Sequence, residues 1–231
     1  MLVVVTRPLP AGRRTARRLE ALGHRAVLAP ILRIEPTGEA PPPGPFDALI
    51  LTSTNAVDGL REGPPALPAF AVGARTAEAA RRAGLDPVAV AEGDARSLAD
   101  LVAARLAAGG RLLHPCGRDR KPEPAASLRA HGFEVAAWEV YAAEPAPALP
   151  AAAADALSGG RAGAVLHYSR RSAAALLALA ERAGLLGSLG HPRHLCLSED
   201  VAGPLAAAGL ARIEVASAPR EEALLALLGA V

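Results

Sequence analysis

Short apolar runs alternate with amphipathic stretches along the whole chain. At 97–106, SLADLVAARL, apolar side chains recur at helical spacing, and similar stretches separate most of the apolar runs. Regular alternation of strand and helix is typical of α/β proteins with mostly parallel sheets, so we predict Rossmann-like or flavodoxin-like parallel-sheet lobes. The apolar runs predict β-strands at 2–6, 25–29, 47–52, 69–72, 87–91, 111–114, 133–137, 164–168, 194–197 and 212–216.

The chain also repeats itself. Residues 2–36 align without gaps to 111–145, with identities that include Gly23 with Gly132 and Pro36 with Pro145. Further along, 46–57 matches 162–173, and 71–91 matches 196–216. Because the matched segments keep their order, the sequence predicts a duplicated α/β unit.

Proline-rich stretches interrupt each repeat instead of separating the two. They lie at 35–45 and 143–150, whereas the junction between the repeats is a tight loop. If such linkers mark domain borders, the chain crosses between domains twice. We therefore expect a ligand cleft between two lobes, at the carboxyl ends of their strands. The expected boundaries are 1–34 plus 147–231 for lobe 1, 39–138 for lobe 2, and hinge strands or linkers at 35–38 and 139–146.

Composition narrows the class of protein. Hydrophobic residues make up 51% of the chain, which suffices for a sizeable core, while the net charge is only +2 and basic runs with interleaved aromatics are missing. These features argue against a nucleic-acid binder. The N-terminus lacks the pattern of a signal peptide, and no apolar run approaches the roughly 20 residues of a membrane span. We expect a cytoplasmic protein that binds neither nucleic acid nor membrane.

Familiar catalytic and cofactor motifs are absent from the sequence. Cys116 and Cys196 lie outside any CxxC pattern, and the histidines do not form HExxH, so we expect no metal site. Neither a dinucleotide fingerprint, a P-loop nor a GxSxG elbow is present.

The residues that follow the predicted strands are mostly small hydroxyls, glycines and arginines. Helix N-termini and arginines both favour anions, so this set indicates an anionic small-molecule ligand. Taken singly, the serines and threonines have a plainer interpretation as helix caps, and the arginines as solvated surface charges. The predicted substrate-binding residues are Arg7, Ser53, Thr54, Asn55, Gly73, Ala74, Thr76, Arg118, Ser169 and Arg170.

Tyr141 breaks the repeat, because Leu32 stands at the matching position. It lies on the approach to the second linker, where we expect both lobes to reach a ligand. A phenol can donate a hydrogen bond or protonate a poor leaving group, which makes Tyr141 a candidate catalytic residue. An amphipathic residue that packs at a linker is the alternative.

In this order, the stretches VVVTRP, FDALILTSTNAV, FAVGARTAEAARRAGL, EVY and AVLHYS resemble the uroporphyrinogen-III synthase family. The resemblance implies two α/β lobes joined by a two-stranded hinge. It also implies cyclisation of hydroxymethylbilane, a linear tetrapyrrole with eight carboxylates, to uroporphyrinogen III with inversion of ring D and loss of water. That family needs no metal or organic cofactor.

The resemblance also implies roles for individual residues. It implies that Tyr141 assists the loss of hydroxide and that Ser53, Thr76 and Ser169 fall at binding positions. We expect a monomer that could receive its substrate from hydroxymethylbilane synthase. One departure concerns the loop after 194–197, where relatives often read Gly-Pro-Thr-Thr and this chain reads Ser-Glu-Asp-Val at 198–201. Two acids there would repel a polyanionic substrate unless they are turned away.

Two other functions remain open at this point. A two-lobed, non-catalytic sensor of a small polyanion would show the same strand ends. A nucleotide-sugar transferase with two Rossmann-like lobes is a further alternative, although the chain is short for one. The products formed from hydroxymethylbilane would distinguish these functions.

Overall fold

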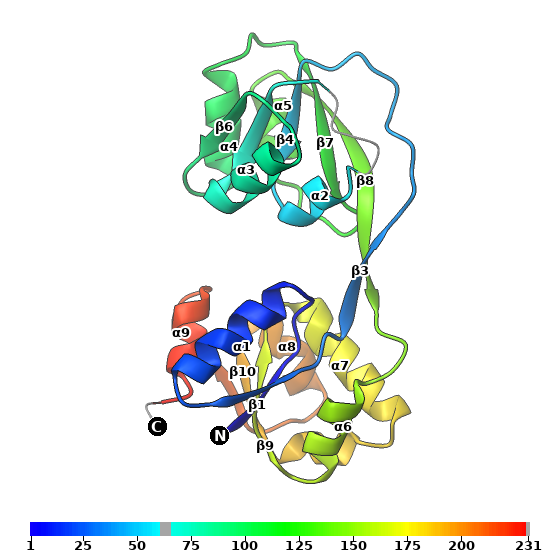
Figure 1. Ribbon diagram of the computed structural model, residues 1–231, viewed down its shortest axis with the longest axis vertical. Helices are drawn as coiled ribbons and strands as arrows, with labels where there is room; N and C mark the ends of the chain where they lie inside the picture. The colour runs from blue at the N-terminus through cyan, green and yellow to red at the C-terminus, as the bar shows by residue number, and fades with distance from the viewer. Residues whose placement is uncertain (61–65, 230–231) are drawn as a thin grey trace. The chain divides into compact units, whose positions relative to one another are not determined.

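The computed structural model describes residues 1–60 and 66–229 and divides into two compact units (Figure 1). Unit 1 consists of Met1–Arg33 with Glu144–Val231, and unit 2 of Ile34–Ala143. The chain leaves unit 1 within β3 (Leu32–Pro36) and returns within β8 (Glu134–Pro145). The hinge role expected for these segments stays a prediction. Residues 61–65 and 230–231, which fall within the predicted lobes, lie outside the described residues.

Unit 1 is built on a five-stranded sheet with the order β11-β10-β9-β1-β2. All four pairings between these strands are parallel. Counted along the unit, the spatial order is 2-1-3-4-5, which is the flavodoxin-like order. Its strands are β1 (Leu2–Val5), β2 (Arg25–Leu28), β9 (Ala162–His167), β10 (Arg193–Cys196) and β11 (Ile213–Val215).

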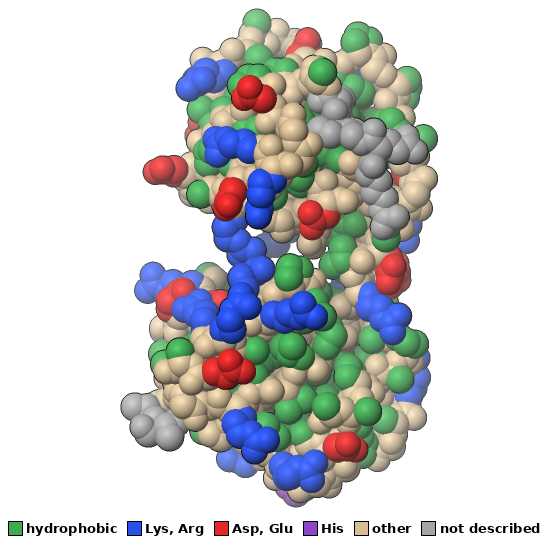
Figure 2. Space-filling view, viewed as in Figure 1, with side chains coloured by type: hydrophobic (Ala, Val, Ile, Leu, Met, Phe, Trp, Pro, Cys, Tyr) green, Lys and Arg blue, Asp and Glu red, His purple; other side chains and the backbone are tan. Residues whose placement is uncertain are grey.

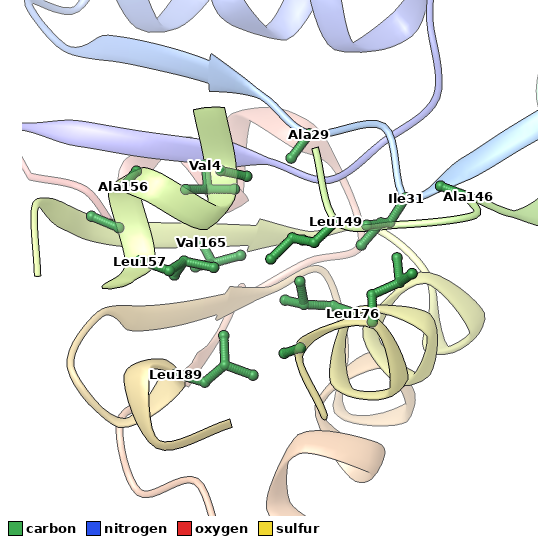
Figure 3. Packing of buried hydrophobic residues seen from close by; sticks show 14 residues of the cluster. Val4, Ala29, Ile31, Ala146, Leu149, Ala156, Leu157, Val165, Leu176 and Leu189 are labelled. Carbon is green, nitrogen blue, oxygen red and sulfur yellow. The ribbon is translucent and has the colours of Figure 1, made fainter. Parts of the chain in front are cut away.

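Helices cover both faces of the unit 1 sheet. On one face, Leu19 of α1 (Ala11–Ala21) and Leu224 of α9 (Glu221–Ala226) pack on Val3 and Leu166. The opposite face is covered by α6 (Ala151–Ser158) and α7 (Arg170–Arg182), with the short 3₁₀ helix Leu186–Gly190 and α8 (Glu199–Ala207) beside them. Figure 3 shows this second core, in which Leu157 and Leu176 contact the strands through Val4 and Val165.

Unit 2 contains a six-stranded sheet with the order β3-β8-β7-β4-β5-β6. The pairings from β8 to β6 are parallel. One face is covered by α2 (Thr54–Asp58) and α3 (Gly73–Arg82), the other by α4 (Ala95–Ala103) and α5 (Ala125–Ala130). The remaining strands are β4 (Ala48–Leu51), β5 (Ala69–Val72), β6 (Val88–Ala91) and β7 (Arg111–Gly117).

The two sheets have the same strand order once the sequence repeat is applied. The alignment matches β1 with β7, β2 with β8, β9 with β4, β10 with β5 and β11 with β6. Under this matching, β2-β1-β9-β10-β11 corresponds strand by strand to β8-β7-β4-β5-β6. The duplication predicted from the sequence is therefore present in the topology, and unit 2 is a circular permutation of unit 1.

The predicted strands all occur, with shifts of one or two residues at most ends, but two features differ. The prediction omitted β3, because its residues merge into a proline-rich stretch. It also ended two strands early, at 114 and 137, whereas β7 continues to Gly117 and β8 to Pro145. The predicted helix 97–106 is α4, which begins two residues earlier because the Asp94 carboxylate accepts from the backbone N–H groups of Arg96 and Ser97. Among the described residues, no helix is both long and apolar enough to cross a membrane.

A pair of buried histidines links β9 to β10. His194 Nε2 lies 2.8 Å from the carbonyl of Leu189, which can only accept, so this nitrogen carries the proton. His194 Nδ1 therefore accepts from His167 Nε2 at 3.0 Å. Burial lowers the pKa of both imidazoles, and it lowers the pKa of His114 in unit 2 to about 4. All three side chains are consequently neutral in the folded protein near neutral pH.

This arrangement predicts sensitivity to mild acid. The folded pKa values lie below the unfolded value of about 6.5, so the unfolded chain binds protons first as the pH falls. The contribution of these neutral imidazoles to the free energy of unfolding is therefore fully present above about pH 6.5. It should decrease by about 1 kcal/mol per imidazole at about pH 5.5. Urea midpoints from circular dichroism at pH 7.5 and 5.5 will measure the change. A midpoint that stays constant over this interval would contradict the neutral assignment.

Candidate functional site

The carboxyl ends of neighbouring strands meet at one edge of each sheet. In parallel sheets, ligands bind outside this edge where the strand order reverses. That point lies between β1 and β9 in unit 1 and between β7 and β4 in unit 2. The predicted residues that follow these four strands are Arg7, Ser169, Arg118 and Ser53, respectively.

Ser53 and Ser169 both cap helices. Ser53 Oγ accepts from the backbone N–H of Asn55 at 3.1 Å, at the start of α2. Ser169 Oγ accepts from the N–H of Ser172 at 3.2 Å, at the start of α7, and donates to Ser172 Oγ. The capping interpretation of both serines is thus confirmed, and Thr54 and Asn55 are the first two residues of α2. Ligand contacts from these residues stay a prediction.

The N-terminus of α3 is more open than the capped N-termini of α2 and α7. Gly73 begins this helix at φ 74°, a left-handed conformation that favours glycine, and a Cβ built on it would have no heavy atom within 4 Å. Val72 precedes it, and a valine side chain has no group that could cap the helix. Ala74 is exposed, whereas Thr76 is buried at 6% exposure. The backbone N–H groups at Gly73 and Ala74, more than the Thr76 hydroxyl, can therefore meet an anion.

Tyr141 belongs to β8 and lies beside the carboxyl end of β7, the neighbouring strand in the sheet. It pairs with Gly117 immediately after a shift in the register, and its carbonyl accepts from the N–H of Arg118 at 2.9 Å. A Cβ on Gly117 would come within 2.8 Å of the Tyr141 ring. Glycine at this position therefore leaves room for the ring to pack against the backbone. The Tyr141 side chain is partly exposed.

In unit 1, Arg7 belongs to a network centred on Glu221, a residue that the sequence analysis did not select. The Glu221 carboxylate accepts from Thr15 at 2.5 Å, from Arg18 at 2.7 Å, from Tyr168 at 2.8 Å and from Arg7 at 3.0 Å. The Arg7 guanidinium also lies over the Tyr168 ring, 4.2 Å from its centroid. Figure 2 shows arginine side chains, drawn in blue, gathered over the part of unit 1 that contains α1.

The electrostatics of this network hold Glu221 charged. Burial alone would raise its pKa, but hydrogen bonds from Thr15 and Tyr168 and the nearby charge of Arg7 outweigh burial, so the pKa lies below its ordinary value. Burial raises the pKa of Tyr168, which stays a neutral donor. Arg7 thus donates to a carboxylate of its own chain through Nη1, and its predicted substrate-binding role stays a prediction.

The two acids after β10, Glu199 and Asp200, are stabilised by their surroundings within unit 1. Arg170 Nη1 lies 3.4 Å from Asp200 Oδ1, at the start of α7 and α8, respectively. Asp200 is thus partly neutralised by a cation of the same unit. Glu199 and Asp200 also occupy the first turn of α8, where negative charge is favourable. The departure in this loop therefore has a structural reason.

A basic pocket lies in unit 2 beside β7 and β8, and it reaches the residues that follow β7. Its volume is about 410 Å³. His114 and Ala137, which pair across the two strands, form its wall. Only Arg118 among its cationic lining residues was predicted from the sequence as a site residue; the four are Arg118, Arg120, Lys121 and Arg129.

The pocket borders the end of β4. His114 Nε2 lies 3.4 Å from the hydroxyl of Thr52, directly before Ser53. Both cysteines are buried, and burial raises the pKa of Cys116 and brings that of Cys196 to about 12, so neither is a reactive thiolate. Within residues 1–60 and 66–229, no group of three or more His, Cys, Asp or Glu side chains could hold a metal ion.

Fold and strand ends together define an α/β protein of two flavodoxin-like units with cationic and hydroxyl-bearing groups at the sheet edges. The family model of uroporphyrinogen-III synthase HemD matches residues 13–226, and the chain belongs to this family. It is a family of cyclising lyases of tetrapyrrole biosynthesis, and the reaction implied by the sequence resemblance is the reaction of this family.

Solved structures agree with the fold. The uroporphyrinogen-III synthetase of Helicobacter pylori is 20% identical, with a TM-score of 0.66 over 98% of this chain and 97% of that one. A mutant uroporphyrinogen III synthase of Thermus thermophilus is 21% identical, with a TM-score of 0.52 over 99% and 96% of the two chains. No curated protein sequence matched the chain.

Proposed function

We propose that this chain converts hydroxymethylbilane to uroporphyrinogen III with the carboxyl edges of its sheets as the substrate-binding surfaces. The observation that carries the proposal is the family match over 13–226, because it spans both units. The geometry supports it, since a substrate with eight carboxylates needs donors and cations at several points. Each unit supplies such groups at the edge where parallel sheets bind ligands.

In unit 2, we assign the α3 N-terminus and the residues after β4 to carboxylate binding. Gly73 and Ala74 offer backbone N–H groups at the positive end of a ten-residue helix. Thr54 and Asn55 are half-buried at the neighbouring strand end. The Thr76 hydroxyl is buried, so its proposed part is to support the first turn of α3.

The proposed catalytic residue is Tyr141. Its phenol donates a proton to the departing hydroxyl oxygen as the carbon–oxygen bond of the hydroxymethyl group breaks, so that water leaves and a cationic azafulvene forms. Attack on this cation by the substituted carbon of ring D gives a spiro intermediate, and its rearrangement inverts the ring. The ring carbon that closes the macrocycle loses a proton, which restores the phenol. The net change is the loss of one water.

In unit 1, Ser169 and Arg170 are the proposed binding residues. They begin α7, a thirteen-residue helix whose N-terminus follows β9 at the reversal of strand order. Arg7 has a structural part in this proposal, because the Glu221 network holds its guanidinium.

We also propose a cytoplasmic monomer that takes its substrate from hydroxymethylbilane synthase. The duplication supports a monomer, because one chain already contains two sheets of the same topology. A molar mass near 23.4 kDa in light scattering is the expected result. A stable mass of twice that value would contradict it.

Turnover separates an enzyme from a non-catalytic sensor. The protein, incubated with a large excess of hydroxymethylbilane, should convert many molecules of substrate per molecule of protein into the type III isomer. A sensor would leave the bulk of the substrate to close spontaneously to the symmetric type I isomer. Type III product limited to one equivalent or less would contradict the enzyme.

A further inference from the structure

The basic pocket of unit 2 differs in polarity from the rest of the same face of the sheet. On the α5 face, Leu112 and Val135 are buried in the apolar core. Two residues further along each strand come His114 and Ala137, which line the pocket instead. The apolar face of the sheet thus gives way to a cationic cavity toward the carboxyl end of β7, at the edge proposed to bind the substrate.

Acidic side chains near the pocket are already engaged. Glu139 accepts from Arg120 at 2.7 Å and lies 3.6 Å from Arg118. Glu123 accepts from the backbone N–H of Ser127 and lies 4.0 Å from Arg96. The Glu139 carboxylate therefore contacts two of the four lining cations, Arg118 and Arg120.

Lys121 is the only lysine of the chain, in which every other basic side chain except histidine is arginine. It is exposed and lines the pocket together with Arg129, whose Nη2 donates to the carbonyl of Val135 at 3.2 Å. That bond fixes the Arg129 guanidinium by one nitrogen and leaves further N–H groups on the same side chain. An ammonium group on a flexible stem adds a point charge that can adjust to the position of an anion.

We propose that this pocket is a carboxylate subsite that binds one acetate or propionate side chain of the tetrapyrrole substrate through Lys121 and Arg129. The proposal rests on the proposed function and assigns it a binding determinant outside the residues selected from the sequence. Tyr141 and Arg118 are joined by a backbone hydrogen bond at the same strand end. A carboxylate held in the pocket would therefore orient the substrate toward the proposed proton donor.

Kinetics of a charge-deletion variant test the subsite. In Lys121→Ala, the loss of a charge-assisted hydrogen bond should raise KM about tenfold and leave kcat within about twofold. Lys121→Arg keeps the charge and should restore KM to within about threefold of wild type. The matched control is Arg82→Ala, which removes one exposed cation at the C-terminal end of α3, toward the opposite edge of the same sheet. A KM for Lys121→Ala equal to that of Arg82→Ala would overturn the proposal.

A binding measurement keeps this test independent of turnover. Equilibrium dialysis of uroporphyrinogen III, in the dark and without oxygen, measures its binding without turnover. The dissociation constant should rise about tenfold in Lys121→Ala and stay unchanged in Arg82→Ala. If the wild-type protein fails to form the type III isomer but Lys121→Ala still raises the dissociation constant, the proposed reaction is wrong and the proposed anion subsite is supported. Equal dissociation constants in all variants would remove the subsite.

Discussion

Tyr141→Phe is expected to lower kcat by at least about 100-fold, the range that general acid catalysis contributes. Phenylalanine keeps the ring against Gly117 and removes only the hydroxyl, so the change isolates proton donation. Stopped assays of type III product against time will measure it, with KM expected to change little. A kcat within about twofold of wild type would remove Tyr141 from the mechanism.

The chain offers a matched control in its only other tyrosine. Tyr168→Phe removes a hydroxyl that donates to Glu221 in unit 1, so it should affect stability and leave kcat nearly unchanged. Gly117→Ala is a useful companion, because its Cβ would press against the Tyr141 ring and displace the phenol without removing it. A lower kcat in Gly117→Ala, with the Tyr168→Phe rate intact, would show that the position of the phenol matters.

Glu221→Ala is expected to lower the free energy of unfolding by about 2–3 kcal/mol. The change leaves Arg7, Arg18, Thr15 and Tyr168 without their shared acceptor, and uncompensated cations in a partly buried site are costly. The value lies below that for a fully buried pair because 20% of the Glu221 side chain is exposed. Urea unfolding followed by circular dichroism measures it.

Glu222→Ala is the matched control for this prediction. Glu222 is the next residue, pairs with the same Arg18 at 2.8 Å and is 64% exposed, so its removal should change stability very little. If Glu221→Ala lowered the free energy of unfolding as little as Glu222→Ala, the result would show that α9 is held by its apolar side chains alone. At pH 4 and below, where carboxylates become protonated, the difference between the two variants should diminish, because the folded pKa of Glu221 lies below its ordinary value.

The sequence predicts this fold well where the information is local or repeated. The strands of both sheets follow from short apolar runs, and the duplication follows from Gly23 with Gly132 and their neighbours in a fixed order. The start of α2 follows from Ser53 as a cap, which the structure confirms. Strand β3 is the exception, because its pairing with β8 comes from elsewhere in the chain.

The candidate site is less predictable, because its contacts join distant parts of the chain. Arg7 and Glu221 are 214 residues apart, so no local pattern distinguishes Arg7 from a free arginine at a strand end. Glu221 has the sequence signature of a helix first turn, and that feature conceals its part in the network. The pocket likewise needs α5 and β8 to bring Arg129 and Ala137 to Lys121. A single lysine in an arginine-rich chain was the one sequence signal that could have indicated it.

The isomer of the product tests the central claim most directly. Wild-type protein, treated with a chelator and desalted, is incubated with freshly made hydroxymethylbilane, and the porphyrins formed on oxidation are separated by isomer. We predict that type III predominates and that the rate of substrate loss exceeds that of the reaction without protein. Type I alone, formed at the uncatalysed rate, would contradict the account.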